Sequence, residues 1–173
     1  MASIGVIGAG TWGTALAVLL HNNGHQTAIW SALPEEIEEM TKTRRHKNLP
    51  EITIPEEIFL TADLEEAMAC KDVLIMAVPS VFVRSTAARM KPFLKKGQLV
   101  VDVAKGIEEG TLKTLSQVIE EELPEAETAI LSGPSHAEEV SRGLPTTCVV
   151  GAHRKNCRLR LRKLLLNHLG KSF

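Results

Sequence analysis

The sequence predicts an α/β fold, with a doubly wound, mostly parallel sheet and helices on both of its faces. Short apolar runs rich in Val and Ile alternate with longer stretches of helical period, which is the pattern of repeated βαβ units. Most of these runs are unbroken, as expected for strands that are covered on both sides. With 173 residues, 44% of them hydrophobic and 24% charged, the chain has enough material for one domain with an ordinary core.

The expected elements follow one another in regular order. Strands are expected at residues 3–7, 26–30, 73–78, 99–103, 128–131 and 147–150. Helices are expected at residues 12–22, 34–43, 64–69, 81–90, 112–123 and 137–141.

Local signals mark several helix ends. Gly24 is expected to close the first helix and Pro34 to open the second at a first-turn position. Asp63, with Glu66 three residues later, forms a potential capping box for the third helix. Two prolines predict a loop over residues 45–58.

Composition argues against several classes of protein. No apolar run approaches the ~20 residues that a membrane span needs, so no span is expected. The start of the chain lacks a signal-peptide pattern, which favours a cytoplasmic location. No nucleic-acid partner is expected. The cysteines have neither CxxC spacing nor a nearby histidine pair, so neither a metal site nor a disulfide framework is predicted for Cys70, Cys148 and Cys157.

A glycine motif directly follows the first expected strand and opens a helix. In Gly8-x-Gly10-x-x-Gly13, the first glycine allows a sharp turn, the second lets the backbone approach a phosphate, and the third lets helix and strand pack closely. The phosphates would lie at the helix N-terminus, where N–H groups and the helix dipole favour an anion. The motif therefore predicts a Rossmann-like domain that binds the pyrophosphate of NAD or NADP. A purely structural glycine turn is the alternative.

The same fingerprint expects an acidic residue at the end of the second strand, to hold the adenosine ribose of NAD. The sequence there reads Ser31-Ala32-Leu33, with neither an acid nor an adjacent arginine. The choice between NAD and NADP therefore stays open. The nearest basic residues in sequence, interpreted as a solvated helix end, are Lys42, Arg44 and Arg45.

Three further motifs follow strands at the edge of the sheet where open α/β folds bind ligands. Pro79 either contacts the cofactor or only ends its strand. Lys105 is placed to meet a phosphate or a carbonyl oxygen, or is merely solvated. Ser135 is a natural N-cap with a capping-box partner three residues later, and it either faces an anion or only caps the helix. His136 is interpreted as a surface histidine.

Four runs in this order carry a resemblance to one known family. They are residues 8–16 (GAGTWGTAL), 77–80 (AVPS), 104–108 (AKGIE) and 131–139 (LSGPSHAEE). On these runs the chain resembles the bacterial NAD(P)-dependent glycerol-3-phosphate dehydrogenases over about residues 1–150. The first and the last run are much more specific than the glycines alone.

The resemblance implies a cytoplasmic enzyme that interconverts dihydroxyacetone phosphate and sn-glycerol 3-phosphate for phospholipid synthesis, by hydride transfer between NAD or NADP and the substrate's C2. It implies a homodimer for the full-length enzyme. The cofactor-binding residues that it implies are Gly8, Gly10, Thr11, Trp12, Gly13, Pro79, Lys105 and Ala137. The substrate-binding residues that it implies are Lys105, Gly133 and Ser135.

The chain departs from the family pattern at three places. Family members often carry a basic residue just after the second strand, where this chain has residues 31–33. Asn48 replaces an aromatic residue expected to pack near the adenine. The family's helical C-terminal domain, with its general-acid lysine, is expected to be absent from these residues, so no catalytic residue is predicted in this chain.

The end of the chain is basic and shows no family resemblance that its motifs reveal. Residues 140–173 hold 8 of the 20 Lys and Arg and none of the 21 Asp and Glu. We expect a cofactor-binding domain over residues 1–150 and a separate basic segment over 151–173, produced by a truncated or out-of-frame gene end. The alternative is a basic amphipathic helix for membranes or acidic partners, with one face formed by Leu161, Leu164, Leu165 and His168.

The sequence is compatible with several functions. The leading hypothesis is the cofactor-binding half of a glycerol-3-phosphate dehydrogenase, inactive alone because catalysis needs groups from both domains. The rivals are the cofactor domain of another two-domain dehydrogenase, a non-catalytic module that senses nicotinamide nucleotides, and a folded domain that binds nothing tightly.

Overall fold

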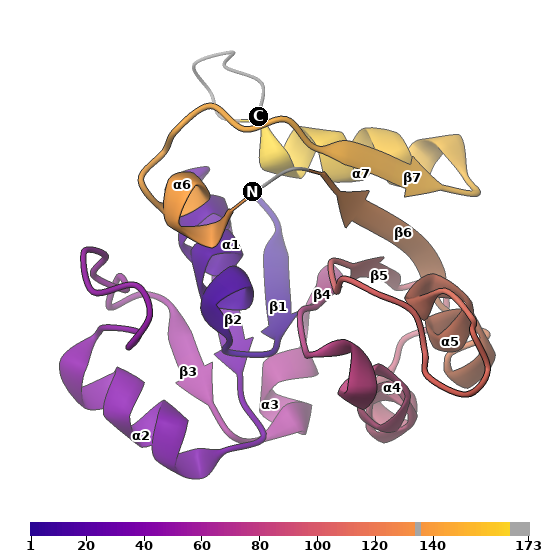
Figure 1. Cartoon of the computed structure of the whole chain (residues 1–173), viewed down its shortest axis with the longest axis horizontal. Helices are drawn as coiled ribbons and strands as arrows, with labels where there is room; N and C mark the ends of the chain where they lie inside the picture. Colours follow the sequence, from indigo (N-terminus) through magenta and orange to yellow (C-terminus); the bar gives the residue numbers. More distant parts are fainter. Residues whose placement is uncertain (134–135, 167–173) are drawn as a thin grey trace.

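A computed structural model describes residues 1–133 and 136–166. They form a seven-stranded sheet in the order β3-β2-β1-β4-β5-β6-β7, with helices on both faces (Figure 1). The strands from β1 to β6 are mutually parallel, and β7 runs antiparallel to β6. The predicted fold class is therefore confirmed. The strands are β1 Ser3–Ile7, β2 Gln26–Trp30, β3 Phe59–Thr61, β4 Val73–Met76, β5 Leu99–Asp102, β6 Glu127–Ser132 and β7 Val149–Ala152.

The helices lie in two layers that sandwich the sheet. One apolar cluster joins the sheet to α1, α2, α6 and α7, and a second joins its other face to α3, α4 and α5. The α-helices are α1 Thr11–Asn22, α2 Pro34–Thr43, α3 Leu64–Met68, α4 Val83–Met90, α5 Leu115–Glu122, α6 Ala137–Ser141 and α7 Lys155–Leu165. Two short 3₁₀ turns flank α4, η1 Ser80–Phe82 and η2 Lys91–Phe93.

The central strands are apolar throughout because both of their faces are covered. In β4, Val73 and Ile75 belong to one cluster, whereas Leu74 and Met76 belong to the other. This is the physical origin of the unbroken apolar runs in the sequence.

The sequence missed one strand, β3, which follows directly after the predicted loop. Three residues are too short to show a strand period, and Phe59 is half exposed at the edge of the sheet. The other predicted strands are all present. The bounds of β1 and β2 agree with the prediction, and those of β4, β5, β6 and β7 differ from it by one or two residues.

The helix-end predictions are largely confirmed, with one correction. Pro34 stands in the first turn of α2, and Gly24 follows α1 with a φ of +85°. The Asp63 carboxylate caps α3 by accepting the N–H groups of residues 65 and 66. The reciprocal half of the predicted capping box is wrong, because Glu66 instead accepts a hydrogen bond from Thr61 Oγ1 at 2.7 Å. The N–H of Asp63 is itself bonded to that hydroxyl oxygen.

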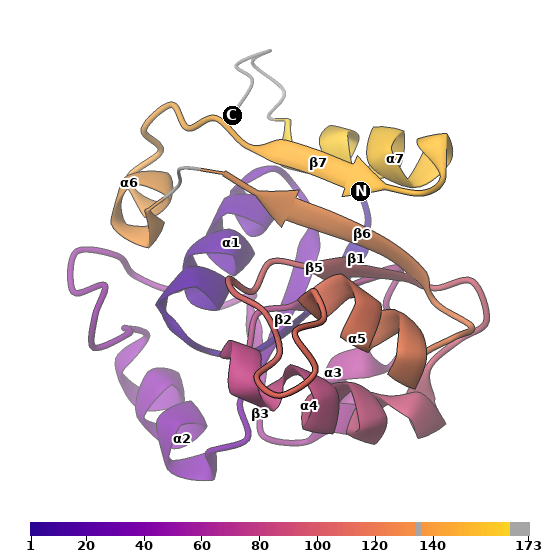
Figure 2. The same cartoon turned by 45° about the vertical axis from the view of Figure 1, so that its right-hand side comes forward.

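The basic C-terminal segment packs against the sheet. Strand β7 crosses the boundary predicted at residue 150, and α7 lies beside it at the edge of the molecule (Figure 2). The predicted apolar face exists, since Leu161, Leu164 and Leu165 are buried in the cluster that contains α1. His168 lies outside the described residues. Within residues 1–133 and 136–166, no helix combines the length and the apolar composition needed to cross a membrane.

Candidate functional site

The carboxyl ends of β1 and β4 meet where the chain changes direction across the sheet. From β1 the chain proceeds to β2 and β3 on one side, and then crosses to β4 on the other. Loops that leave two such strands diverge and open a crevice, which is the usual ligand position in open α/β sheets. The loop after β1 begins at Gly8, and the loop after β4 begins at Ala77.

Two glycines in the first of these loops are required by packing. Gly8 has a φ of +126°, and a Cβ there would lie 2.6 Å from the carbonyl oxygen of Ala77. A Cβ on Gly13 would lie 2.1 Å from the carbonyl oxygen of Gly8. Both distances are below the contact range of real Cβ atoms. The turn and packing roles predicted for these two glycines are therefore confirmed.

Gly10 differs, because a Cβ there would meet nothing within 4 Å and would enter open space. It is the N-cap residue of α1, and among the described residues no side chain caps this helix and no acid lies in its first turn. The first backbone bond of the helix runs from the Thr14 N–H to the Gly10 carbonyl at 2.9 Å. The backbone N–H groups of residues 11–13 precede this bond and have no acceptor within the helix. Together with the helix dipole they favour an anion at this end.

Two cavities flank this turn. The β2-side cavity has a volume of about 510 Å³, and its wall includes Gly8, Gly10, Trp30, Ser31, Glu36, Pro79, Phe82 and Arg89. The β5-side cavity has a volume of about 390 Å³, and its wall includes Gly10, Thr11, Trp12, Pro79, Lys105, His136 and Ala137. Both are bounded by Gly10 and Pro79, so the two spaces meet at the N-terminus of α1.

Most of the residues predicted to bind ligands line these two cavities. The β5-side cavity brings together Thr11, Trp12, Pro79, Lys105 and Ala137 from four separate segments of the chain. Parallel strands place their carboxyl ends at one edge, which is why motifs far apart in sequence converge here.

Of the other two predicted substrate residues, Gly133 lies away from both cavities and Ser135 is not among the described residues. Gly133 directly follows β6 with a φ of +152°, and a Cβ there would lie 2.7 Å from the carbonyl oxygen of Thr147. It lines neither cavity, and its substrate contact stays a prediction. Ser135 lies outside the described residues. The N-cap of α6 is His136, one residue later than the predicted cap, because His136 has the extended φ and ψ of −101° and 137°.

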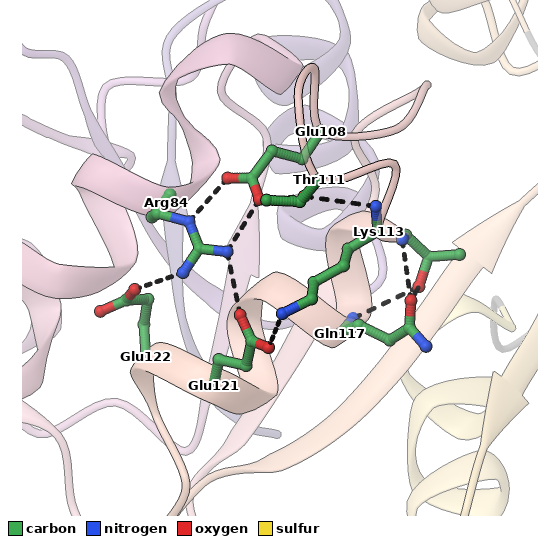
Figure 3. Close-up of polar contacts among 8 residues, drawn as sticks. Arg84, Glu108, Thr111, Lys113, Gln117, Glu121 and Glu122 are labelled. Carbon is green, nitrogen blue, oxygen red and sulfur yellow. Dashed lines mark hydrogen bonds and ion pairs between the residues drawn. The ribbon is translucent and has the colours of Figure 1, made fainter.

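The segment that carries Lys105 is held in place by one arginine of α4 (Figure 3). Arg84 Nε and Nη2 donate to the two carboxylate oxygens of Glu108 at 2.6 and 2.8 Å. The same guanidinium donates to Glu122 at 2.6 Å and to Glu121 at 2.9 Å, both on α5. These contacts lower the pKa of Glu108 to about 2, chiefly through its hydrogen bonds with Arg84. The loop between β5 and α5 is thereby tied to both helices.

Asp102, three residues before Lys105, is buried at the end of β5. Its Oδ1 accepts the N–H of Ala104 at 3.0 Å. Burial raises the pKa of this carboxyl to about 6, although the hydrogen bond from Ala104 opposes the rise. Asp102 lines neither cavity, so it supports the strand end without facing the ligand space.

A loop after α2 packs beside the glycine turn. Asn48 Nδ2 donates to Thr11 Oγ1 at 3.3 Å, and the Asn48 N–H donates to Nδ1 of the buried His46 at 3.2 Å. Burial lowers the pKa of His46, partly offset by nearby carboxylates and by a hydrogen bond to the Ala9 backbone. Position 48 therefore lies at the start of α1 and does not line the β2-side cavity.

Sequence reasoning also missed Glu36. This residue belongs to the first turn of α2, yet it lines the β2-side cavity next to the end of β2. Ser31 Oγ donates to Glu36 Oε2 at 2.6 Å. One sequence signal for Glu36 was available. Pro34 marks the start of the helix, so Glu36 belongs to its first turn, close to the end of β2.

Comparison with known proteins decides the family. The family model described as NAD-dependent glycerol-3-phosphate dehydrogenase N-terminus matches residues 3–158. The chain belongs to this family. Glycerol-3-phosphate dehydrogenases of the NAD(P)+ type from Agathobacter rectalis and Fusobacterium nucleatum are 50% and 52% identical to it over 170 residues. A crystal structure of the glycerol-3-phosphate dehydrogenase from Coxiella burnetii superposes with a TM-score of 0.91 at 29% identity, covering 96% of this chain and 51% of that one.

The extent of this similarity matters for the family assignment. The match to the Agathobacter dehydrogenase covers 98% of this chain, so it continues well beyond residue 150, where the motifs reveal no resemblance. The chain spans about half the length of these relatives, 51% in both bacterial dehydrogenases. What the whole relatives do is therefore an inference for this chain.

Proposed function

We propose that this chain is the cofactor-binding half of a cytoplasmic, NAD(P)-dependent glycerol-3-phosphate dehydrogenase, which interconverts dihydroxyacetone phosphate and sn-glycerol 3-phosphate for phospholipid synthesis. The observation that carries the proposal is the N-terminus of α1, which has no side-chain cap in the described structure and opens at Gly10 onto both cavities. An extended dinucleotide needs one anion site between two pockets, and this geometry supplies it.

The residues present fit such a cofactor. In the proposal, the pyrophosphate is held by the backbone from Gly8 to Gly13, with Thr11 and Trp12 touching the cofactor. Pro79, Lys105 and Ala137 contact it from the β5-side cavity, whose wall they form. When bound, the nicotinamide supplies or accepts the hydride.

Substrate binding is proposed through Lys105, which lines the β5-side cavity, together with Gly133 and Ser135. The ammonium of Lys105 supplies positive charge where the substrate's oxygen or phosphate is negative. The general acid is proposed to come from the part of the relatives that this chain does not span, and the full-length enzyme is proposed to be a homodimer. Residues 1–173 alone are then expected to bind the cofactor without turnover.

The site is tested by replacing Gly10 with valine and titrating with NADH and NADPH. Because a Cβ at position 10 meets nothing within 4 Å, the Gly10→Val side chain fits the fold but fills the space before α1. We expect the wild-type chain to show a nucleotide-dependent change in the fluorescence of Trp12, which lines the β5-side cavity, and the variant to lose it.

Circular dichroism serves as the control for folding. Gly13→Ala is the contrasting variant, since its Cβ collides with the Gly8 carbonyl and the fold itself should suffer. A folded Gly10→Val chain that binds as tightly as wild type would show that the phosphates lie elsewhere. Failure of the wild-type chain to bind either nucleotide at millimolar concentration would refute the proposed function.

A further inference from the structure

A carboxylate of the following helix, α2, lies next to the end of β2. Residues 31–33 contain no acid, although an acidic residue at this point is how many dinucleotide-binding domains hold the ribose hydroxyls of NAD. The first turn of α2 folds back toward the strand and brings Glu36 to the same place. Glu36 and Ser31 line the β2-side cavity together with Gly8 and Gly10.

The position of this carboxylate is fixed by Ser31. Ser31 is buried, with 5% of the residue exposed. Its hydroxyl accepts a hydrogen bond from the N–H of Leu33 at 3.2 Å and donates one to Glu36 Oε2 at 2.6 Å. Because the hydroxyl has one proton, this arrangement leaves the carboxylate as the acceptor. Among the described residues, Glu36 Oε1 receives no hydrogen bond. The carboxylate thus keeps one oxygen without a described partner, and Glu36 is part of the cavity wall.

The basic residues nearest in sequence make contacts outside this cavity, although Arg45 lines a separate cavity of about 270 Å³ together with Glu36. Lys42 pairs with Glu38, and Arg44 Nε lies 3.0 Å from a carboxylate oxygen of Glu56. Arg45 donates to the carbonyl of Pro50 at 2.8 Å. None of these three cations lines the β2-side cavity.

One cation, Arg89 of α4, does line the cavity. The guanidinium carbon of Arg89 lies 5.2 Å from the ring centroid of Trp30, over the face of the indole. A guanidinium stacked in this way forms a flat wall suited to a planar base. Glu36 instead stands beside Ser31 and the strand end, which is where the fingerprint of dinucleotide-binding domains places the ribose contact.

We propose that Glu36, positioned by Ser31, binds the adenosine ribose hydroxyls and makes this chain select NAD(H) over NADP(H). The inference rests on the proposed function, since it requires a nicotinamide dinucleotide in the groove. A carboxylate accepts hydrogen bonds from two vicinal hydroxyls, whereas it repels a 2′-phosphate.

The experiment is isothermal titration calorimetry of NADH and NADPH with three chains: wild type, Glu36→Gln and Glu35→Gln. Glu35 is the matched control, because it is an exposed neighbour in the same turn that does not line the β2-side cavity. Its replacement removes the same charge without touching the Ser31 contact. Circular dichroism verifies that all three chains are folded alike.

We expect wild type to bind NADH about tenfold more tightly than NADPH. The ribose hydroxyls of NADH gain a charge-assisted hydrogen bond to Glu36, whereas the 2′-phosphate of NADPH is repelled by it. Glu36→Gln should weaken NADH, strengthen NADPH and shrink their ratio about tenfold, whereas Glu35→Gln should keep the wild-type ratio.

Three results would overturn the proposal. They are an equal or higher affinity of wild type for NADPH, an unchanged ratio in Glu36→Gln, and an equal change in both glutamine variants. If wild type prefers NADPH and Arg89→Gln removes that preference, the 2′-phosphate is held by Arg89. Failure of wild type to bind either nucleotide would instead refute the proposed function itself, and this inference with it.

Discussion

Asp102 shows how a single side chain can reduce the stability of this fold. Its side chain sits at the end of a central strand, and the residue is only 4% exposed. Burial raises the pKa of the carboxyl from 3.8 to about 6. Ionising the folded state is therefore harder than ionising the unfolded chain. The stability that depends on a protonated Asp102 is complete below about pH 4 and is lost as the pH rises through about 6.

Asp102→Asn is accordingly expected to stabilise the protein at neutral pH. The asparagine keeps an acceptor for the Ala104 N–H and carries no charge to bury. We expect a gain of roughly 2–3 kcal/mol in the free energy of unfolding at pH 7, and almost none at pH 4, by urea unfolding at both values. A variant equally different from wild type at both values would show that ionisation of Asp102 has no part in the effect.

Among the elements, the loop between β5 and α5 depends on a contact that links three segments. The Glu108 N–H bonds to the Lys113 carbonyl at 2.9 Å, and the Leu112 N–H bonds to the Glu108 carbonyl at 3.0 Å. Arg84 holds this small turn by its bidentate contact with Glu108 (Figure 3). Without the guanidinium, three carboxylates would face one another without a cation shared between them.

Arg84→Ala is expected to loosen this loop and leave the sheet intact. Amide hydrogen exchange at Glu108 and Leu112 should become several-fold faster, while amides of β4 and β5 should keep their protection. Arg142→Ala is the matched control, because Arg142 makes a surface pair with Glu51 at 2.7 Å on another part of the molecule. Equal exchange of the loop in wild type and Arg84→Ala would mean that backbone bonds alone order it.

The sequence predicted elements well where the signal is local. The bounds of β1 and α2 agree with the prediction, since the first is an apolar run beside a glycine and the second begins at Pro34. Helix α5 begins three residues later than predicted, because Leu112 adopts a φ of +57° and Thr114 forms a capping box with Gln117.

The parts of the site that the sequence predicts are likewise those with a local signal. The glycine turn is predicted because its three glycines lie within six positions. Each motif that follows a strand is likewise a short run of consecutive residues. Arg84 meets carboxylates that are 24, 37 and 38 positions away, and no local pattern indicates such pairs. The local pattern does not indicate Glu36, because the fingerprint expects an acid at the end of β2 and this acid lies in the next helix.

For the molecule as a whole, the position of α7 bears on the domain boundary predicted at residue 150. Asn23, just after α1, donates two hydrogen bonds of 3.1 Å to the carbonyls of Leu164 and Leu165 at the end of α7. His25 makes a further contact of 3.1 Å with the Leu164 carbonyl. These bonds join the ends of two helices more than 130 residues apart. The basic helix thereby packs with α1 over one face of the sheet, and its apolar side is part of the protein's own core.

Leu161→Ala tests whether α7 folds as one unit with the sheet. Leu161 is 1% exposed, so its truncation should cost about 2–5 kcal/mol, whereas Leu159→Ala on the same helix, 45% exposed, should cost far less. Unfolding in urea is followed by Trp30, which is buried beside β1, in a Trp12→Phe background so that Trp30 reports alone. If α7 belongs to the same cooperative unit, Leu161→Ala shifts the Trp30 transition to lower urea. If residues 1–150 fold independently, the Trp30 transition stays at the position of the Leu159→Ala control.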